Sequence, residues 1–348
     1  MHLLSQSRKK TLQLIFILFF SFSLRIYKLG SIPYGINFPE AENIIFCKRI
    51  LYYLLNSPVA FETKLFAIRL FTAIPSSFVP LMAYFLWLKL SKENNHLIGF
   101  ILALTIAFSP WHIYLSRRFL ILPVLFAIIL AIILIFAKRI MKLKSVWLYV
   151  IAALLGIITI FFDMFIVPDG KVSIKPIWTE SSGFFDFVFI WLSNISSYFN
   201  LSRLGFEDEI YILGVKSNSP LLASTIPFII VGFLVLIKNF SKYKIVIFST
   251  LIYTSILSFF YPPFNLSLAL GLIPVYALLT ALGLQTFIYL FSNKIVRFVI
   301  VILLIGVFSF NIFRSLFVLR YYQPVFDKLE QKENHFSSSF LTKIKLDK

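Results

Sequence analysis

The segment from Ser109 to Arg118, SPWHIYLSRR, holds the densest group of side chains that could carry out chemistry. His112 lies among aromatic residues, and Arg117 and Arg118 are adjacent. A guanidinium donates paired hydrogen bonds to phosphate oxygens, so we expect the two arginines to clamp a phosphate group. Binding of ordinary lipid headgroups and capping of a helix end are the alternatives for the arginines. An interfacial histidine with ordinary hydrogen bonds is the alternative for His112.

Glu40 and Glu42 are the candidate catalytic residues. A carboxylate at a membrane surface can accept the proton of an attacking hydroxyl, as general-base catalysis requires. Pro39 precedes them at a position suited to the first residue of a helix, so both acids also fit a first helical turn, where they favour the helix dipole. Catalytic and structural interpretations stay open for Glu40. The structural interpretation is favoured for Glu42.

The sequence contains no pattern typical of a metal or cofactor site. Cys47 is the single cysteine, so it forms no intramolecular disulfide, and no Cys/His spacing resembles a zinc site. Glu207, Asp208 and Glu209 form an acidic cluster, which we interpret as a solvated turn, with contact to a metal or a sugar as the alternative. We therefore expect no cofactor and name no metal ligand, while a divalent metal stays open.

The composition indicates how these residues are positioned. Hydrophobic residues make up 59% of the 348 residues and charged residues 14%, and the mean hydropathy is +0.89. Uncharged stretches such as Phe119–Ala137 are long enough to cross a bilayer as helices. We therefore predict an all-α, polytopic integral membrane protein with a single membrane domain and about nine spans. The expected spans are Thr11–Leu24, Leu65–Trp87, Leu97–Leu115, Phe119–Ala137, Val146–Val167, Ser219–Ile237, Ile245–Tyr261, Leu266–Phe291 and Ile295–Leu319.

Basic residues predict the orientation of these spans. The formal net charge is +18, which we attribute to short cytoplasmic loops rather than to nucleic-acid binding. With the amino terminus inside, alternate connections carry Lys89 and Lys92, Lys138 to Lys144, Lys238 to Lys244, and Lys294 with Arg297. This arrangement predicts a multi-pass protein of the cell membrane with a cytoplasmic amino terminus. Residues 28–64, 168–218 and the tail 320–348 then lie on the extracytoplasmic side.

Polar features gather on the predicted outer side. Helices lying at the membrane interface are expected at Pro39–Leu55 and Phe184–Phe199. Arg69, Asp163 and Arg314 lie within spans, near their outer ends. A charge in hydrocarbon costs several kcal/mol unless it snorkels, pairs or faces water. Snorkelling explains any one of them, whereas together they indicate a polar cavity that opens outward.

Three runs in the amino-terminal half resemble the GT-C superfamily of membrane glycosyltransferases. They are LRIYKLGSIPYGINFPEAEN (Leu24–Asn43), RLFTAIPSSFVPLMAYFLWLKL (Arg69–Leu90) and SPWHIYLSRR. The similarity is to the bacterial branch related to protein mannosyltransferases and lipid A aminoarabinose transferases. Asn194–Ile237 and Asn265–Leu284 resemble later segments of that branch.

The resemblance implies a multi-pass enzyme of the cell envelope that transfers a sugar, with inversion, from a polyprenyl-phosphate-linked donor to an unidentified acceptor outside. It also implies a catalytic acid in the first outer loop, often in an Asp-Glu pair. Pro39 and Glu40 stand at the matching positions, so the aspartate is missing and Glu40, or else Glu42, would take its role.

The expected site joins this acid to Arg117 and Arg118 as donor-phosphate ligands, with His112 and Arg69 beside them. The first alternative is a catalytically silent membrane protein that binds lipid-linked glycan or a partner. The second is a transporter or flippase, which would require charges near the bilayer midplane and duplicated halves.

Overall fold

The computed structural model describes residues 2–30, 40, 43–44, 47, 51, 53, 55–90, 96–118, 120–140, 149–158, 181–201, 221–260 and 271–317. These residues form helices and their connections, with no strand among them. The predicted all-α class is therefore confirmed for this part of the chain.

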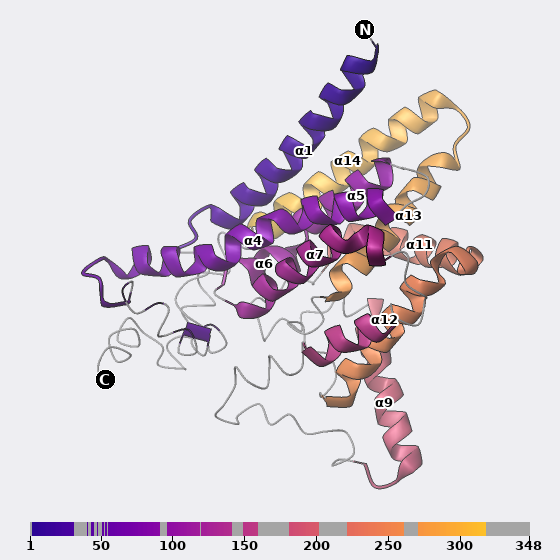
Figure 1. The fold of residues 1–348 in the computed structure, drawn as a ribbon. Coiled ribbons are helices and arrows are strands. Elements are labelled where there is room, and N and C mark those ends of the chain that lie inside the picture. Colours follow the sequence, from indigo (N-terminus) through magenta and orange to yellow (C-terminus); the bar gives the residue numbers. More distant parts are fainter. Residues whose placement is uncertain are drawn as a thin grey trace.

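Five helices form the amino-terminal part of the bundle (Figure 1). They are α1 (His2–Ile26), α4 (Phe61–Leu90), α5 (His96–Ala107), α6 (Pro110–Ser116) and α7 (Ile121–Ile140). The long α4 is the centre of this group, because α1, α5 and α7 all pack against it. The short α6 contacts α1, α4 and α5. Side chains on α4 and α6 can therefore meet at one end of the group.

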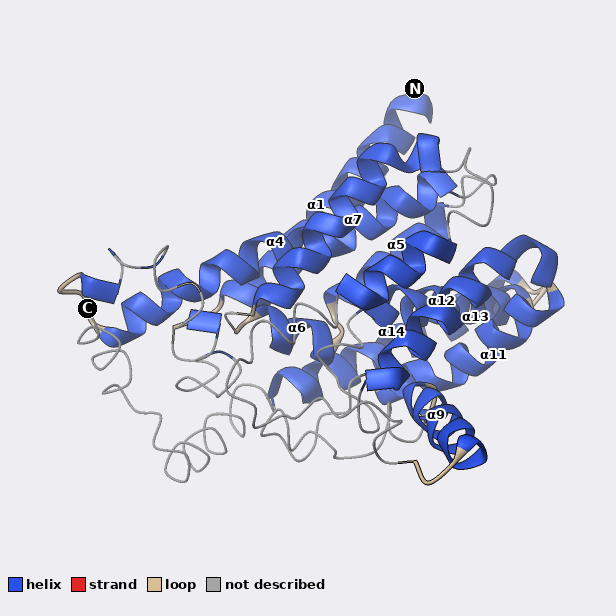
Figure 2. Cartoon of the chain, turned by 60° about the horizontal axis from the view of Figure 1, so that its bottom comes forward, coloured by secondary structure: helices blue, strands red, loops and turns tan. Residues whose placement is uncertain are grey.

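The carboxy-terminal part contains α9 (Phe184–Tyr198), the 3-10 turn η3 (Ala223–Thr225), α11 (Ile226–Lys238), α12 (Phe240–Phe260), α13 (Ile273–Tyr289) and α14 (Lys294–Phe317). A further helical stretch covers Tyr149–Ile158. α13 joins the two parts of the bundle, because it packs against both α11 and α5. α9 projects from the rest (Figure 2). It is attached to α12 by the Trp191 indole, which donates to the carbonyl oxygen of Ser255 at 3.2 Å.

The helices are shorter than the predicted spans in several places. Among the described residues, only Phe61–Lys89 is by itself long and apolar enough to cross a membrane. α11 and α12 meet the same criterion together, but they are bent by 117° at the break between them. The predicted span Leu97–Leu115 is also interrupted, because α5 ends at Ala107 and Pro110 begins α6. The number of spans thus stays an expectation.

α11 and α13 cross in close contact through two glycines. A Cβ added at Gly232 would overlap the backbone of Leu279, and one added at Gly283 would overlap the backbone of Phe228. From Phe228 to Gly232 along α11, the contacted residues on α13 run backwards from Gly283 to Leu279. The two helices α11 and α13 are therefore antiparallel. Strict alternation of the predicted spans would instead make these two segments parallel.

We expect Gly232→Ala and Gly283→Ala each to destabilise the protein by about 1–3 kcal/mol, because a methyl group at either position forces two backbones apart. The measurement is thermal unfolding in detergent. Gly306→Ala on α14 is the matched control, since its added Cβ meets no heavy atom within 4 Å. A midpoint that is unchanged in the first two variants, or equally lowered in all three, would contradict the close crossing.

Candidate functional site

Glu40 forms a buried ion pair with Arg69 of α4. Both side chains are 0% exposed. Arg69 Nε donates to Glu40 Oε1 at 2.8 Å, and Arg69 Nη2 donates to Glu40 Oε2 at 2.9 Å. The remaining terminal nitrogen of Arg69 donates to the carbonyl oxygen of Leu29 at 3.0 Å. A paired geometry of this kind is the strongest that arginine makes with a carboxylate, so Arg69 fixes the position and the charge of Glu40.

Arg118 contacts the same carboxylate. Its Nη1 donates to Glu40 Oε2 at 3.3 Å, and its Nε donates to the hydroxyl of Tyr114 at 3.0 Å. The guanidinium carbon also lies 5.2 Å from the centre of the Tyr114 ring, within the range of a cation–π interaction. The structure therefore brings together three of the residues singled out in the sequence, Glu40, Arg69 and Arg118.

The local sequence explains how α6 presents these groups. Ser109 is the N-cap, and its hydroxyl accepts a hydrogen bond from the backbone N–H of His112, while Pro110 occupies the start of the helix. The helix ends at Ser116, and Arg117 is its C-cap. Tyr114 lies one turn before Arg118, which places its hydroxyl beside the guanidinium. The seven-residue helix thus positions Arg118 at the point where the chain turns toward α7.

Arg117 contacts the end of α1 instead of Glu40. Its two terminal nitrogens donate to the carbonyl oxygens of Leu24 and Tyr27 at 2.5 and 2.6 Å. The last carbonyls of a helix have no partner within the helix and carry the negative end of its dipole. This geometry matches the helix-end alternative for Arg117 and leaves Arg118 as the arginine that meets the carboxylate.

His112 is paired with Arg25, which lies one residue before the end of α1. Arg25 Nη2 lies 2.5 Å from His112 Nδ1. Because guanidinium nitrogens only donate, Nδ1 accepts and the histidine proton resides on Nε2. His112 is 1% exposed, and its Nε2 has no hydrogen-bond partner among the described residues. Burial and the Arg25 charge hold the pKa of His112 well below its usual range, so the imidazole is neutral.

Other predicted positions lie outside the described residues. These are Pro39, Glu42, Asp163 and the cluster Glu207, Asp208 and Glu209. Arg314 lies on α14, where its side chain is outside the described part. Within the described ranges, no group of three His, Cys, Asp or Glu side chains could hold a metal ion.

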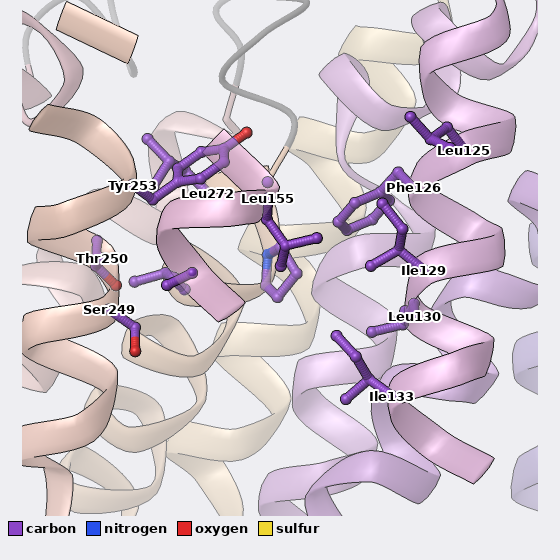
Figure 3. Close-up of a pocket in the computed structure, with 14 residues that line it drawn as sticks. Leu125, Phe126, Ile129, Leu130, Ile133, Leu155, Ser249, Thr250, Tyr253 and Leu272 are labelled. Carbon is purple, nitrogen blue, oxygen red and sulfur yellow. The ribbon is translucent and has the colours of Figure 1, made fainter. Parts of the chain in front are cut away.

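An apolar cavity of about 230 Å³ lies between α7, Tyr149–Ile158, α12 and the start of α13 (Figure 3). Ser249, Thr250 and Tyr253 supply its polar groups. The apolar lining comes from Leu125, Phe126, Ile129, Leu130, Ile133, Ala152, Leu155, Leu272, Pro274 and Val275. Sequence reasoning missed this cavity, because apolar residues that line a cavity look the same in a sequence as those that pack in a core.

Comparisons with known proteins yielded no match: no family model, no curated protein and no solved structure is similar to this chain.

The buried neutral state of His112 leads to a pH prediction. The unfolded chain binds a proton at His112 below about pH 6.5, whereas the folded chain resists protonation until a lower pH. Stability from this group is therefore complete above about pH 6.5 and is lost as the pH falls, at up to about 1.4 kcal/mol per pH unit. We expect His112→Gln to reduce the drop in unfolding midpoint between about pH 7 and pH 5. An equal drop in the wild type and in His112→Gln would contradict this assignment.

Proposed function

We propose that this chain is an integral membrane glycosyltransferase that takes a sugar from a polyprenyl-phosphate-linked donor and transfers it to an acceptor on the extracytoplasmic side. The observation that carries the proposal is the contact of Arg118 with Glu40, since it joins a phosphate-binding group to a carboxylate. The resemblance of Leu24–Asn43 and Ser109–Arg118 to GT-C enzymes supports the same assignment.

Exposed side chains support a lipid environment for the chain. Large apolar residues cover exposed positions of α14, such as Phe298 at 66%, Leu303 at 63% and Phe310 at 66%. Contiguous apolar surface of this kind is unusual on a protein surrounded by water. Among apolar helices, a buried cluster of ionised side chains is costly and marks a functional site more often than a structural one.

In the proposed reaction, an acceptor hydroxyl attacks the anomeric carbon from the face opposite the lipid phosphate. The bond between this carbon and the phosphate oxygen breaks, the electron pair stays on that oxygen, and the hydroxyl proton passes to Glu40. Arg118 stabilises the negative charge that develops on the departing phosphate. The sugar is transferred with inversion of configuration, because attack and departure occur on opposite faces.

Arg69 has a different part in this scheme from the one expected. Both Glu40 oxygens accept its hydrogen bonds, so Arg69 serves to hold the carboxylate rather than to bind the donor. A carboxylate between two guanidiniums is a weaker base. Oε2 accepts from both arginines, so a phosphate group that displaces Arg118 removes one of these two bonds and frees one acceptor position on Oε2 for the proton.

The same pairing favours a second candidate function, a binding protein for lipid-linked glycan without catalysis. Glu40 is 0% exposed and its negative charge is stabilised on both sides. If the carboxylate only orients Arg118, the site binds a lipid phosphate and releases it unchanged. The two candidates differ in whether product forms.

We expect Glu40→Gln to lower transfer at least a hundredfold, the usual contribution of a general base, while donor binding persists. Arg118→Gln should weaken donor binding about tenfold or more, because a charged hydrogen-bond donor is lost. The measurements are transfer and donor binding in membranes supplied with polyprenyl-phosphate sugars. Lys238→Gln, an exposed basic residue on α11, is the control.

Undiminished transfer by Glu40→Gln would remove Glu40 from its catalytic role. Donor binding by the wild type without any product would favour the binding protein. Thermal unfolding of each variant shows whether a loss comes from the fold.

The apolar cavity predicts a dependence on the length of the lipid. A cavity of about 150 Å³ binds benzene, so this one accommodates on the order of nine carbon atoms. Ala152→Phe fills the cavity and should lower the preference for long-chain over short-chain donors at least tenfold. The reason is that each buried CH₂ group contributes about 0.8 kcal/mol to binding. Leu154→Phe, at an exposed position of the same helix, is the control. An unchanged ratio of long-chain to short-chain activity in Ala152→Phe would exclude the cavity as a site for the lipid chain.

A further inference from the structure

The segment that carries Glu40 also contacts the start of α7. Asn43 is 4% exposed, and its Oδ1 accepts a hydrogen bond from the backbone N–H of Ile121 at 2.9 Å. Ile121 is the first residue of α7, and the first N–H groups of a helix have no acceptor within it. Asn43 therefore supplies a helix cap from a distant part of the sequence.

Glu40 and Asn43 are both helical residues and lie three positions apart in the sequence. The backbone N–H of Cys47 donates to the carbonyl of Asn43, and that of Leu51 donates to the carbonyl of Cys47, both at 3.0 Å. This four-residue spacing is that of an α-helix, in which residues three apart are neighbours on the surface. Glu40 thus contacts the side chain of Arg118 while Asn43 contacts the backbone three residues after Arg118.

Leu120, the residue before Ile121, is itself bonded to α4. The Thr72 hydroxyl donates to the carbonyl oxygen of Leu120 and accepts from the backbone N–H of Leu120, both at 3.3 Å. Leu120 N–H also approaches the carbonyl of Arg118 at 2.9 Å. Ile121 follows Leu120 directly, so its position is fixed as well. The hydrogen bond from Ile121 N–H to Asn43 therefore holds the segment that carries Glu40 in place.

We propose that Asn43 is the positioning residue of this site: by capping α7 it holds the segment of Glu40 against Arg118. The inference about geometry stands on these contacts alone, whereas its consequence for transfer rests on the proposed function. Without the Asn43 bond, the contacts that still hold this segment include the ion pairs of Glu40 and the hydrogen bond from Lys64 Nζ to the carbonyl oxygen of Leu55 at 3.0 Å. Arg69 still holds the carboxylate, but the segment that carries it shifts relative to Arg118, whose contact with Glu40 is the longer one at 3.3 Å, and acceptor activation falls more than donor binding does.

Cys47 provides a native reporter of this docking. It is the only cysteine in the chain, it lies one turn after Asn43, and it is half-buried. Burial also raises the pKa of its thiol, so the docked segment reacts slowly with thiol reagents. The experiment measures the rate at which a membrane-impermeant maleimide labels Cys47 in the full-length protein, in membranes, at constant pH and without any substrate.

Asn43→Leu should increase the labelling rate about tenfold, because it leaves the part-buried N–H of Ile121 without its acceptor. Asn43→Asp should restore the slow rate, since its carboxylate accepts the same bond and its charge favours a helix N-terminus. Ser196→Ala on α9, whose hydroxyl bonds only within its own helix in the described structure, is the control. If Asn43→Leu does not accumulate, Asn43→Ser gives a milder test, because its side chain is too short to reach Ile121.

An unchanged labelling rate in Asn43→Leu, or a fast rate that Asn43→Asp does not restore, would overturn the positioning role. In transfer assays, Asn43→Leu should lower kcat about tenfold with a smaller change in KM for the donor, and Asn43→Asp should recover kcat. A general loss of folding would lower the amount of active protein without this recovery. If the wild type transfers no sugar, the proposed function fails while the labelling result still decides the role of Asn43.

Discussion

The buried pair of Glu40 and Arg69 is the interaction on which the arrangement of the site depends. Its two short hydrogen bonds join the first connecting segment to α4, the helix against which α1, α5 and α7 pack. Removing either partner would leave an uncompensated charge in an apolar interior, which costs several kcal/mol. The pair therefore sets where the carboxylate lies, and Arg118 and Asn43 adjust the rest of the segment around it.

The ion pair that positions Glu40 also opposes the action of this carboxylate as a base. A carboxylate clamped by a guanidinium is well positioned but weakly basic, and Glu40 and Arg118 are at most 1% exposed in this structure. The proposed reaction requires that substrate binding loosens a contact that the unbound protein keeps closed. A phosphate group has the charge to compete for Arg118, so in this proposal the binding of a lipid phosphate removes one of the two hydrogen bonds that Glu40 Oε2 accepts.

The sequence predicts which types of residue form the candidate site more successfully than it predicts which residues contact one another there. Arginines beside aromatic residues and acids after a proline mark Arg117 with Arg118, and Glu40 with Glu42, as candidates without a structure. Arg69 was expected among the donor ligands, yet it clamps Glu40, and Arg117 caps α1. No local pattern distinguishes these uses, because a guanidinium bonds carbonyl, carboxylate and phosphate oxygens through the same nitrogens. Asn43 and Arg25 gave no sequence signal, since their acceptors and donors lie about 80 residues away.

The sequence by itself predicted a helical chain, which the described residues confirm, and placed the candidate polar residues at a few positions, because long apolar runs with few charges favour helices. The tertiary structure alone decided which arginine meets the acid, where the cavity lies and how α11 crosses α13. Those outcomes depend on contacts between distant segments, on backbone approach at Gly232 and Gly283, and on the bend after α11. Periodicity and composition describe each segment separately, so they carry no information on how the segments meet.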